Sequence, residues 1–367
     1  MELLSVTMND GVMPRSEIEG KDNSSEDKSN YKVVLTGDMV YNSMRMWQGA
    51  NGISPCDGIV SPAYTVLMPK IPISNGYFAA FFKSPNLINE FRKNSQGMTS
   101  DTWNLKYPQI ETIKVCIPAL SEQNRVADML RTLERRIAKQ AQLVDNLKKY
   151  KRGLSSSLFD EISKSGCPTV SFADGFRLLQ NNTFSRDDLS YDVGDVRNIH
   201  YGDVLIKYGT VTDIGALSVP CIKPDRDIEK FSSSSYLRNG DIVFADTAED
   251  YTVGKATEIV GVTNQRVLSG LHTIPCRPHD RFAPMFLGHY FNSYHFRRQI
   301  YRMIQGIKVS SISKSEIAKT TILTPPYDVQ RKVASVLSEV DHLIEKEAET
   351  VIVLQKIRRG LLQQLFI

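Results

Sequence analysis

The sequence has few cysteines, no long apolar run and no large excess of one charge, and each absence excludes a class of protein. Its five cysteines are scattered among 367 residues without Cys-x-x-Cys or Cys/His spacing, which argues against a disulfide framework and a zinc site. No run of 18 apolar residues and no secretion signal occur, so we expect a cytoplasmic protein with no membrane partner. A formal charge of +4 does not by itself indicate a polyanionic ligand. What is present is ordinary globular composition, 41% apolar and 23% charged, in a chain long enough for two domains.

The chain contains an internal repeat of long period. Residues 118–159 align with residues 325–366 without a gap at a shift of 207, and 16 of the 42 positions are identical, whereas chance gives roughly one match in fifteen to twenty. In both copies apolar residues recur at steps of three and four, the heptad pattern of a long helix with a packed seam. About 38 residues at 1.5 Å each predict a rod of roughly 57 Å, which needs a partner along its length. Two copies in one chain favour intramolecular antiparallel pairing over a homodimer zipper.

The polar interruptions of the seam coincide in the two copies. Gln140 matches Glu347 and Lys151 matches Arg358, so we interpret them as residues that set the register of the pair. Basic stretches at 148–152 and 356–359 also coincide, and they fit phosphate contact, a docked subunit or ordinary solvation of a helix end. The predicted subunit and helix interface consists of Gln123, Val126, Leu130, Leu133, Ile137, Val144 and Leu147 in the first copy and Gln330, Val333, Leu337, Val340, Ile344, Val351 and Leu354 in the second.

The segments between the helices repeat more loosely. Residues 35–41 resemble residues 238–244, a Gly-Asp turn leading into a strand, and a Gln-Gly loop precedes each helix. We therefore predict an α+β fold in which two β-rich domains are separated by two long antiparallel coiled-coil helices, related by a pseudo-twofold internal repeat. The predicted boundaries are 1–117 for the first domain, 118–160 for the first helix, 161–323 for the second domain and 324–367 for the second helix.

The first copy is shorter than the second. Residues 160–366 make a repeat of 207 residues, but only 159 residues precede Asp160, so about 48 residues equivalent to 160–207 have no counterpart. The chain is thus expected to begin inside its first domain. That domain should lack strands equivalent to the apolar runs Val170–Leu179 and Tyr191–Ile206. A sheet without those strands exposes edges and apolar surface, which natural proteins normally cover.

These features together resemble the specificity (S) subunit of type I restriction-modification enzymes. The resemblance covers nearly the whole chain and is strongest at Ile117–Gln123, Pro325–Gln330, Arg45–Ala50 and Asp57–Tyr64. It implies two target recognition domains on two paired helices, which read a bipartite site in double-stranded DNA and dock two modification (methyltransferase) subunits and two restriction (motor and nuclease) subunits. By the same resemblance this chain is not an enzyme and binds no cofactor or metal, since S-adenosylmethionine, ATP and Mg would belong to the partner subunits. The short first domain departs from the family pattern and leaves a second interpretation open, a truncated or inhibitory fragment or half-site reader that acts as a scaffold.

Three groups of side chains have the chemistry of DNA recognition. Arg, Gln and Thr can hydrogen-bond to base edges, and Lys can hold phosphates, while glycine-containing loops can approach the backbone. For each candidate, core packing or turn chemistry is the competing interpretation. The candidates are Arg45, Trp47 and Gln48 after one predicted strand, Lys207, Tyr208 and Thr210 after the predicted strand 199–206, and the loop residues Gln96, Ser100, Gln305, Lys308, Ser310 and Ser311.

A fused methyltransferase or nuclease is a further alternative that the motifs disfavour. The segment Thr324–Tyr327 is similar to the Pro-Pro-Tyr motif of amino-methyltransferases, but a threonine stands where that motif needs Asn or Asp. A helix entry with proline near its first position explains the same residues. No glycine-rich loop for S-adenosylmethionine and no Walker motif occur. The sequence therefore predicts a DNA reader without catalytic activity of its own.

Overall fold

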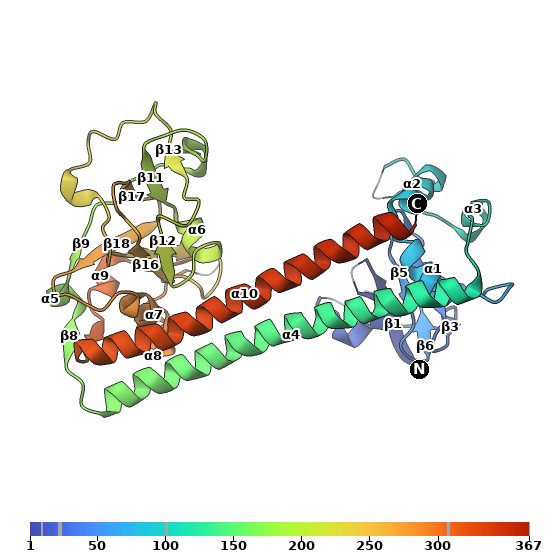
Figure 1. The fold of residues 1–367 in the computed structure, drawn as a ribbon, viewed down its shortest axis with the longest axis horizontal. Coiled ribbons are helices and arrows are strands. Elements are labelled where there is room, and N and C mark those ends of the chain that lie inside the picture. The colour runs from blue at the N-terminus through green and yellow to red at the C-terminus, as the bar shows by residue number, and fades with distance from the viewer. Residues whose placement is uncertain (9, 21–23, 100–101, 307–308, 367) are drawn as a thin grey trace. The chain divides into compact units, whose positions relative to one another are not determined.

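The computed structural model describes residues 1–8, 10–20, 24–99, 102–306 and 309–366, and it divides into two compact units (Figure 1). One unit comprises Met1–Leu143 with Glu347–Ile367, and the other comprises Val144–Lys346. Each unit contains one β-rich domain and a part of each long helix. The division therefore cuts through both helices, and neither helix forms a unit of its own. No helix in the described ranges is long and apolar enough to cross a membrane.

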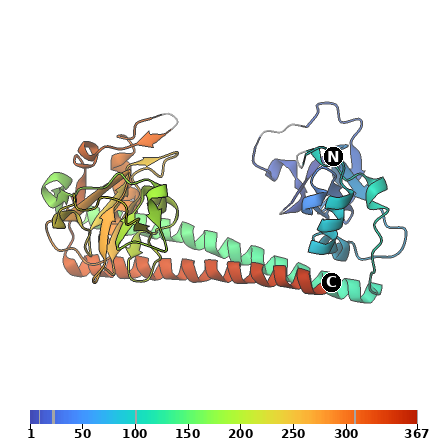
Figure 2. The same cartoon turned by 90° about the horizontal axis from the view of Figure 1, so that it is seen from above.

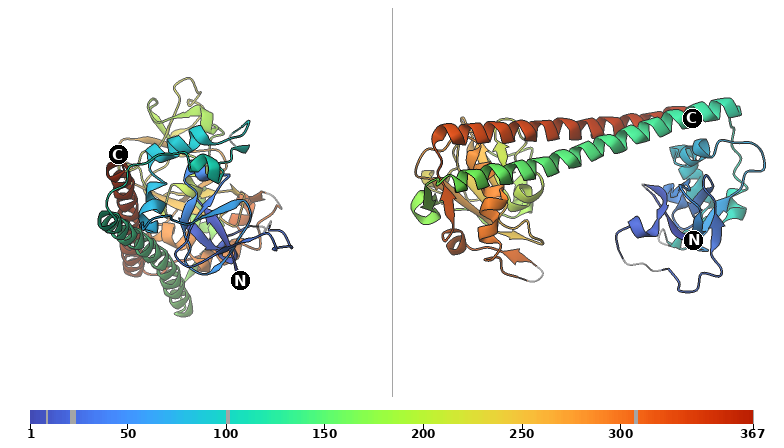
Figure 3. Two further views of the ribbon diagram at one scale, coloured as in Figure 1. Left: turned by 90° about the vertical axis from the view of Figure 1, so that its right-hand side faces the viewer. Right: turned by 90° about the horizontal axis from the view of Figure 1, so that it is seen from below.

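The two long helices are α4 (Leu120–Lys164) and α10 (Tyr327–Leu365), and they pack together as an antiparallel pair (Figures 1 and 3). In the first unit the start of α4 shares a core with the end of α10, through Val126, Leu130 and Leu362. In the second unit the end of α4 shares a core with the start of α10, where Phe159 lies with Leu337. The prediction of intramolecular antiparallel pairing is confirmed. Prolines before each start and the steady heptad pattern explain why both stretches are helical.

The domain of the first unit has a four-stranded sheet in the order β2-β1-β6-β3 and a three-stranded sheet in the order β5-β4-β7. Its strands are β1 (Glu2–Thr7), β2 (Gly11–Pro14), β3 (Lys32–Val34), β4 (Met39–Asn42), β5 (Asn51–Ile53), β6 (Gly58–Val60) and β7 (Tyr64–Leu67). Its helices are η1 (Arg15–Glu17), η2 (Met46–Gln48), α1 (Asn75–Phe81), α2 (Pro85–Asn94) and α3 (Tyr107–Ile110).

The domain of the second unit has larger sheets, ordered β10-β13-β11-β17 and β12-β16-β14-β18-β9, and two short pairs, β15-β19 and β20-β8. Its strands are β8 (Thr169–Ser171), β9 (Phe176–Leu178), β10 (Leu189–Ser190), β11 (Val196–Ile199), β12 (Val211–Asp213), β13 (Cys221–Ile222), β14 (Ile242–Ala245), β15 (Thr247–Ala248), β16 (Ala256–Val260), β17 (Arg266–Ser269), β18 (Thr273–Pro278), β19 (Ser310–Ser311) and β20 (Thr321–Leu323). Its helices are α5 (Phe172–Gly175), η4 (Arg186–Asp188), α6 (Tyr201–Ile206), η5 (Ser233–Ser235), α7 (Phe286–Asn292), α8 (Tyr294–Ile300) and α9 (Lys314–Ile317).

The strand pairings show the repeat and correct one expectation. The antiparallel neighbours β5-β4-β7 correspond to β16-β14-β18. In the second unit β11 runs parallel to β17, and in the first unit β1 runs parallel to β6 in the same way. The first domain therefore does have a strand in the place of β11, and the prediction that 191–206 lacks any counterpart is wrong on this point. The predicted strand 199–206 is also wrong, because β11 ends at Ile199 and helix α6 follows.

Among its described residues, the first domain has no counterpart of β8 and β9, as predicted for Val170–Leu179. In the second unit β8 pairs with β20, which buries Ile322 completely. The equivalent residue of the first unit, Val115, lies outside any strand and is 40% exposed. In the second unit β9 also pairs with β18, at Cys276, Arg277 and Pro278.

Candidate nucleic-acid interface

Each domain is attached to the start of the long helix that follows it by one buried glutamine. Gln123 accepts a hydrogen bond from the backbone N–H of Ser74 (3.0 Å), and its Nε2 donates to the carbonyl of Pro118 (2.9 Å). Gln330 repeats this arrangement, accepting from the N–H of Ala283 (2.9 Å) and donating to the corresponding proline carbonyl (2.8 Å). The two glutamine side chains are thus satisfied in the same way. The predicted interface at these two positions is an interface between a helix and its own domain.

A phenylalanine near the end of each helix attaches that helix to a domain. Phe159, on α4, packs against two aromatic rings of α7 with centroid separations of 5.9 and 5.3 Å. Phe366, which follows α10 and occupies the equivalent position in the repeat, packs against two rings of α1 at 5.2 Å each. The partners are Phe286 and Tyr290 for Phe159, and Tyr77 and Phe81 for Phe366. Each domain is therefore held by both helices.

The charged interruptions of the seam form equivalent ion pairs between the helices. In the second unit Lys151 of α4 lies 2.5 Å from Asp341 of α10. In the first unit Arg358 of α10 donates through Nε and Nη2 to Glu134 of α4, at 3.1 and 3.0 Å. The shift of 207 residues maps Lys151 onto Arg358 and Glu134 onto Asp341. Both copies of the repeat therefore keep the same contact, with the basic residue on α4 in the second unit and on α10 in the first.

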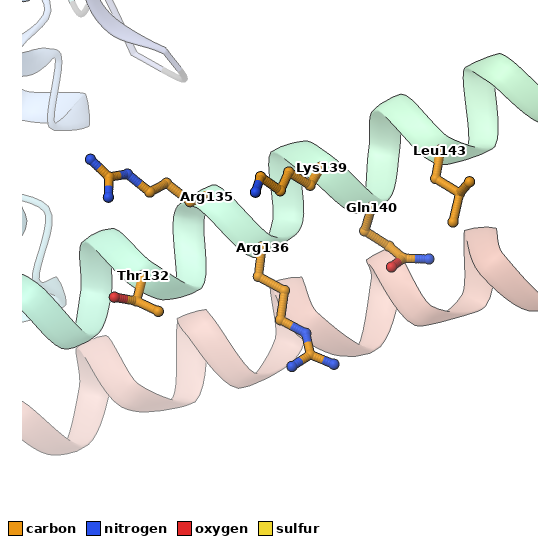
Figure 4. A pocket seen from close by; sticks show the side chains of 6 residues that line it. All are labelled: Thr132, Arg135, Arg136, Lys139, Gln140 and Leu143. Atoms are coloured by element: carbon orange, nitrogen blue, oxygen red, sulfur yellow. The ribbon is translucent and has the colours of Figure 1, made fainter.

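The remaining interruption, Gln140, contacts its own counterpart in the repeat. Its Nε2 donates to the carboxylate of Glu347 on α10. Figure 4 shows Gln140 on the side of α4 that faces α10, with Arg135 and Lys139 directed away. The same stretch of α4 borders an open hollow of about 550 Å³. Its lining residues are Thr132, Arg135, Arg136, Lys139, Gln140 and Leu143.

A second set of polar contacts fixes the domain of the second unit to α10. Thr210 donates from its hydroxyl to Asp341 (3.2 Å) and lies 3.4 Å from Nδ1 of His289. The other ring nitrogen of His289 lies 2.9 Å from the hydroxyl of Ser338 on α10. Burial, reinforced by the charge of Lys151, lowers the pKa of His289 to about 4, although Asp341 opposes the shift. The imidazole is therefore neutral near pH 7 and serves as a hydrogen-bonding bridge.

Beside this network a buried carboxyl group holds the start of α7. Glu258 accepts hydrogen bonds from the backbone N–H groups of Met285 (2.7 Å) and Gly288 (2.9 Å). Burial raises its pKa to about 7, and the N–H donors only partly offset that rise. Met285 has a positive φ of 68° at the N-cap of α7, a conformation that this anchoring sustains.

Two of the residues predicted to contact DNA in the second domain, Tyr208 and Thr210, make contacts inside the second unit. Tyr208 is 1% exposed and lies in the domain core, so its ring is not available to a base. Thr210 makes the contacts with Asp341 and His289 just described and belongs to the attachment to the helices. Tyr208 and Thr210 take these positions because the segment follows a helix, α6, and not a strand. Lys207 is exposed, and its ammonium lies 4.9 Å from the ring centre of Tyr191 and donates to the carbonyl of Ser218 (2.5 Å).

In the first domain the structure brings the two predicted groups together. Arg45 caps η2, which carries Trp47 and Gln48, and Gly49 ends it with a φ of 83°. The Trp47 ring meets the ring of Trp103 edge-on at 5.1 Å, and Arg92 lies over Trp47 at 5.6 Å. Trp103 belongs to the Gln-Gly loop, whose base is closed by two backbone hydrogen bonds between Gln96 and Asn104 (3.0 and 2.8 Å). One patch therefore contains η2 and the loop. Ser100 lies outside the described residues.

The corresponding loop of the second domain is closed in the same way. Gln305 and Ser311 exchange two backbone hydrogen bonds, at 3.0 and 2.8 Å. Ser310 and Ser311 form β19, which pairs with β15. In Figure 2 this pair, drawn as yellow and orange arrows, lies on the side of its domain away from α4 and α10. Lys308 lies outside the described residues.

Comparisons with known proteins agree on the architecture. No family model matches the sequence. Solved structures do match it over nearly its whole length. The S subunit of a type I restriction-modification system from M. genitalium superposes with a TM-score of 0.53 at 12% identity, covering 92% of this chain and 84% of that one. The chain has the fold of a type I restriction-modification specificity subunit. A chain from a structure that addresses complex assembly and conformational transition of the type I R-M system superposes with a TM-score of 0.57 at 17% identity, covering 93% of this chain and 84% of that one.

The sequence could not identify the residues that attach the domains in this specificity-subunit fold. His289, Ser338 and Asp341 belong to segments distant in sequence and meet only after folding. A signal was nevertheless present for Gln123 and Gln330, because both occupy an otherwise apolar seam at equivalent positions. A duplicated polar residue in a packed seam indicates a specific partner.

Proposed function

We propose that this chain is the DNA-recognition subunit of a type I restriction-modification complex. Its two domains each read one half of a bipartite site in double-stranded DNA, and the helix pair sets the distance between the halves. The chain has no catalytic role. Two methyltransferase subunits and two motor and nuclease subunits dock on it in the cytoplasm and bring S-adenosylmethionine, ATP and Mg.

The duplicated attachment of domain to helix is the observation that carries this proposal. Glutamine, phenylalanine and ion-pair contacts recur at equivalent positions in both units. The domain parts away from these contacts have diverged in sequence and in strand number. A conserved attachment with divergent outer surfaces suits two readers of different sequences on one frame. It does not suit an enzyme with a single catalytic centre.

Co-expression with the neighbouring modification subunit, followed by methylome sequencing, tests the proposal. We expect methylation of adenines within one bipartite, asymmetric motif with a fixed spacer. The matched control is the modification subunit without this chain, which should leave the genome unmethylated at that motif. Methyl transfer by the isolated chain, or modification that ignores sequence, would refute the proposal.

A half-site reader is a second candidate, which the first domain specifically favours. Val115 is 40% exposed where Ile322 is fully buried, and Cys116 is exposed where Leu323 is 3% exposed. The patch around Trp47 offers a surface for DNA. If the smaller sheets of the first domain impair reading, the methylome will show one defined half and one degenerate half. A motif defined equally well on both sides would exclude this candidate.

A further inference from the structure

The turn between β17 and β18 holds a histidine in a conformation that normally favours glycine. His272 has a φ of 54°, and it is one of only two non-glycine residues with positive φ among the described residues. The other, Met285, is held by Glu258 as described above. His272 lies in a turn, and its side chain is 48% exposed. Left-handed backbone in a side-chain-bearing residue is a cost that tends to persist where the side chain has a function.

Three groups lie around the exposed imidazole: the Asp246 carboxylate, the Thr247 hydroxyl, which is 3.5 Å from Nδ1, and the ring of Tyr201. The backbone N–H of Asp246 donates to the carbonyl of His272 (3.1 Å), and the Asp246 carboxylate lies 3.3 Å from its Nδ1. The ring of Tyr201 lies edge-on at 5.3 Å. Thr247 donates its hydroxyl to the same carboxylate (2.7 Å). The imidazole is thus fixed on two sides, while nearly half of its side-chain surface faces solvent.

This cluster adjoins the predicted loop of the second domain. Thr247 begins β15, and β15 pairs with the Ser310–Ser311 strand that closes the Gln-Gly loop. Asp246 also accepts, through its backbone carbonyl, the N–H of Ile312 (2.9 Å). His272 therefore lies beside the β15-β19 pair at the base of the loop, and Figure 2 shows that pair on the side of its domain away from the helices.

We propose that His272, positioned by Asp246, reads one base pair of the half-site recognised by the second domain. This inference rests on the proposed function. The Asp246 carboxylate beside Nδ1 favours the tautomer that carries its proton on Nδ1, and the acceptor lone pair of that tautomer is on Nε2. A lone pair accepts a hydrogen bond from an exocyclic amino group in the major groove, which belongs to adenine N6 or cytosine N4. The chemical class of ligand is therefore an adenine or a cytosine edge.

The test compares variants of the full chain in complex with its modification subunit. Once the motif is known, methylation rates are measured on duplexes that carry each single substitution in the half-site of the second domain. His272→Gly removes the imidazole and relieves the positive φ. We expect roughly tenfold weaker discrimination at one position, with a melting temperature that is unchanged or higher. His272→Asn, which tolerates this backbone conformation and keeps an acceptor oxygen, should retain part of the discrimination.

His279→Gly is the matched control, because His279 is an exposed histidine at the opposite end of β18. This variant should leave the discrimination at every position of the half-site unchanged. Unchanged discrimination with His272→Gly would overturn the inference, and so would a uniform loss at every position accompanied by a lower melting temperature, since that indicates a structural role. If the wild-type complex itself shows no sequence preference, the proposed function has failed, a result distinct from failure of His272 alone.

Discussion

Glu258 and His289 should make opposite contributions to the pH dependence of stability, and single substitutions should separate them. Both groups are buried where the second domain meets the helices. The pKa of Glu258 is raised from 4.5 to about 7, and the pKa of His289 is lowered from 6.5 to about 4. Each of these changes corresponds to about 3 kcal/mol in the free energy of unfolding.

The signs follow from which state binds the proton. Between pH 4.5 and pH 7 the folded protein holds a proton on Glu258 that the unfolded chain releases, so this group stabilises most at low pH and its contribution disappears as the pH rises to 7. Between pH 6.5 and pH 4 the unfolded chain protonates His289 while the folded protein does not. Its contribution is therefore complete above pH 6.5 and is lost as the pH falls through 4. In the wild-type protein the two contributions change with pH in opposite directions and nearly cancel.

Removing one group reveals how the other makes the free energy of unfolding depend on pH. On acidification from pH 7 to pH 4.5, the free energy of unfolding of Glu258→Gln should fall by about 3 kcal/mol relative to wild type. On acidification from pH 6.5 to pH 4, that of His289→Asn should rise by about 3 kcal/mol relative to wild type. Both tryptophans, Trp47 and Trp103, lie in the first unit, so their fluorescence does not report on this region. The stability of this region is measured by amide hydrogen exchange of β14 and β16, with the exchange rates corrected for the intrinsic effect of pH on them.

Controls on exposed groups keep the comparison specific. Glu249→Gln and His279→Asn change the same side-chain types at exposed positions of the same domain. These variants measure the change in stability that the same replacement of side-chain type brings at an exposed position. Difference curves that are flat for both buried variants, or that slope in the same direction, would refute the assignment of opposite linkage.

Three further predictions concern the two long helices, α4 and α10, and the domains attached to them. Phe366→Ala should destabilise the first unit by about 3 to 5 kcal/mol, detected by tryptophan fluorescence, whereas Phe159→Ala should leave that signal unchanged; equal effects would contradict separate attachments. Exchanging residues 161–323 for those of a relative should alter one half of the methylated motif, and a change in both halves would contradict modular reading. Inserting one heptad into both long helices adds about 10 Å and should lengthen the spacer by about three base pairs, so an unchanged spacer would argue against the helices as its ruler.

The helix pair was predictable because its signal is long and duplicated. A seam sustained over 42 aligned positions leaves little choice of structure, and the polar interruptions indicated specific contacts before their partners were known. The partners themselves were not predictable. Glu134 and Asp341 look like ordinary surface charges in the sequence, and only the antiparallel register places them beside Arg358 and Lys151.

The recognition domains were predicted less well because their elements are short. Residues 199–206 have the apolar content of a strand, yet His200 accepts the N–H of Gly202 and starts a helix there. That change turns Tyr208 into the core and Thr210 toward α10. β1 was missed as a counterpart of β11 because two strands with little sequence in common can occupy one place in a sheet.

The attachment contacts also explain how such a frame can carry changing specificity. The Gln123 and Gln330 contacts use backbone N–H and C=O groups, which are the same whatever side chains the domain carries. Phe159 and Phe366 are held by aromatic rings on the first helix after each sheet, α7 and α1. The loops that contain Gln96 and Gln305 contribute to none of these contacts. Substitution in those loops therefore leaves the orientation of a domain on the helices intact, and a new surface can be presented to DNA without a new frame.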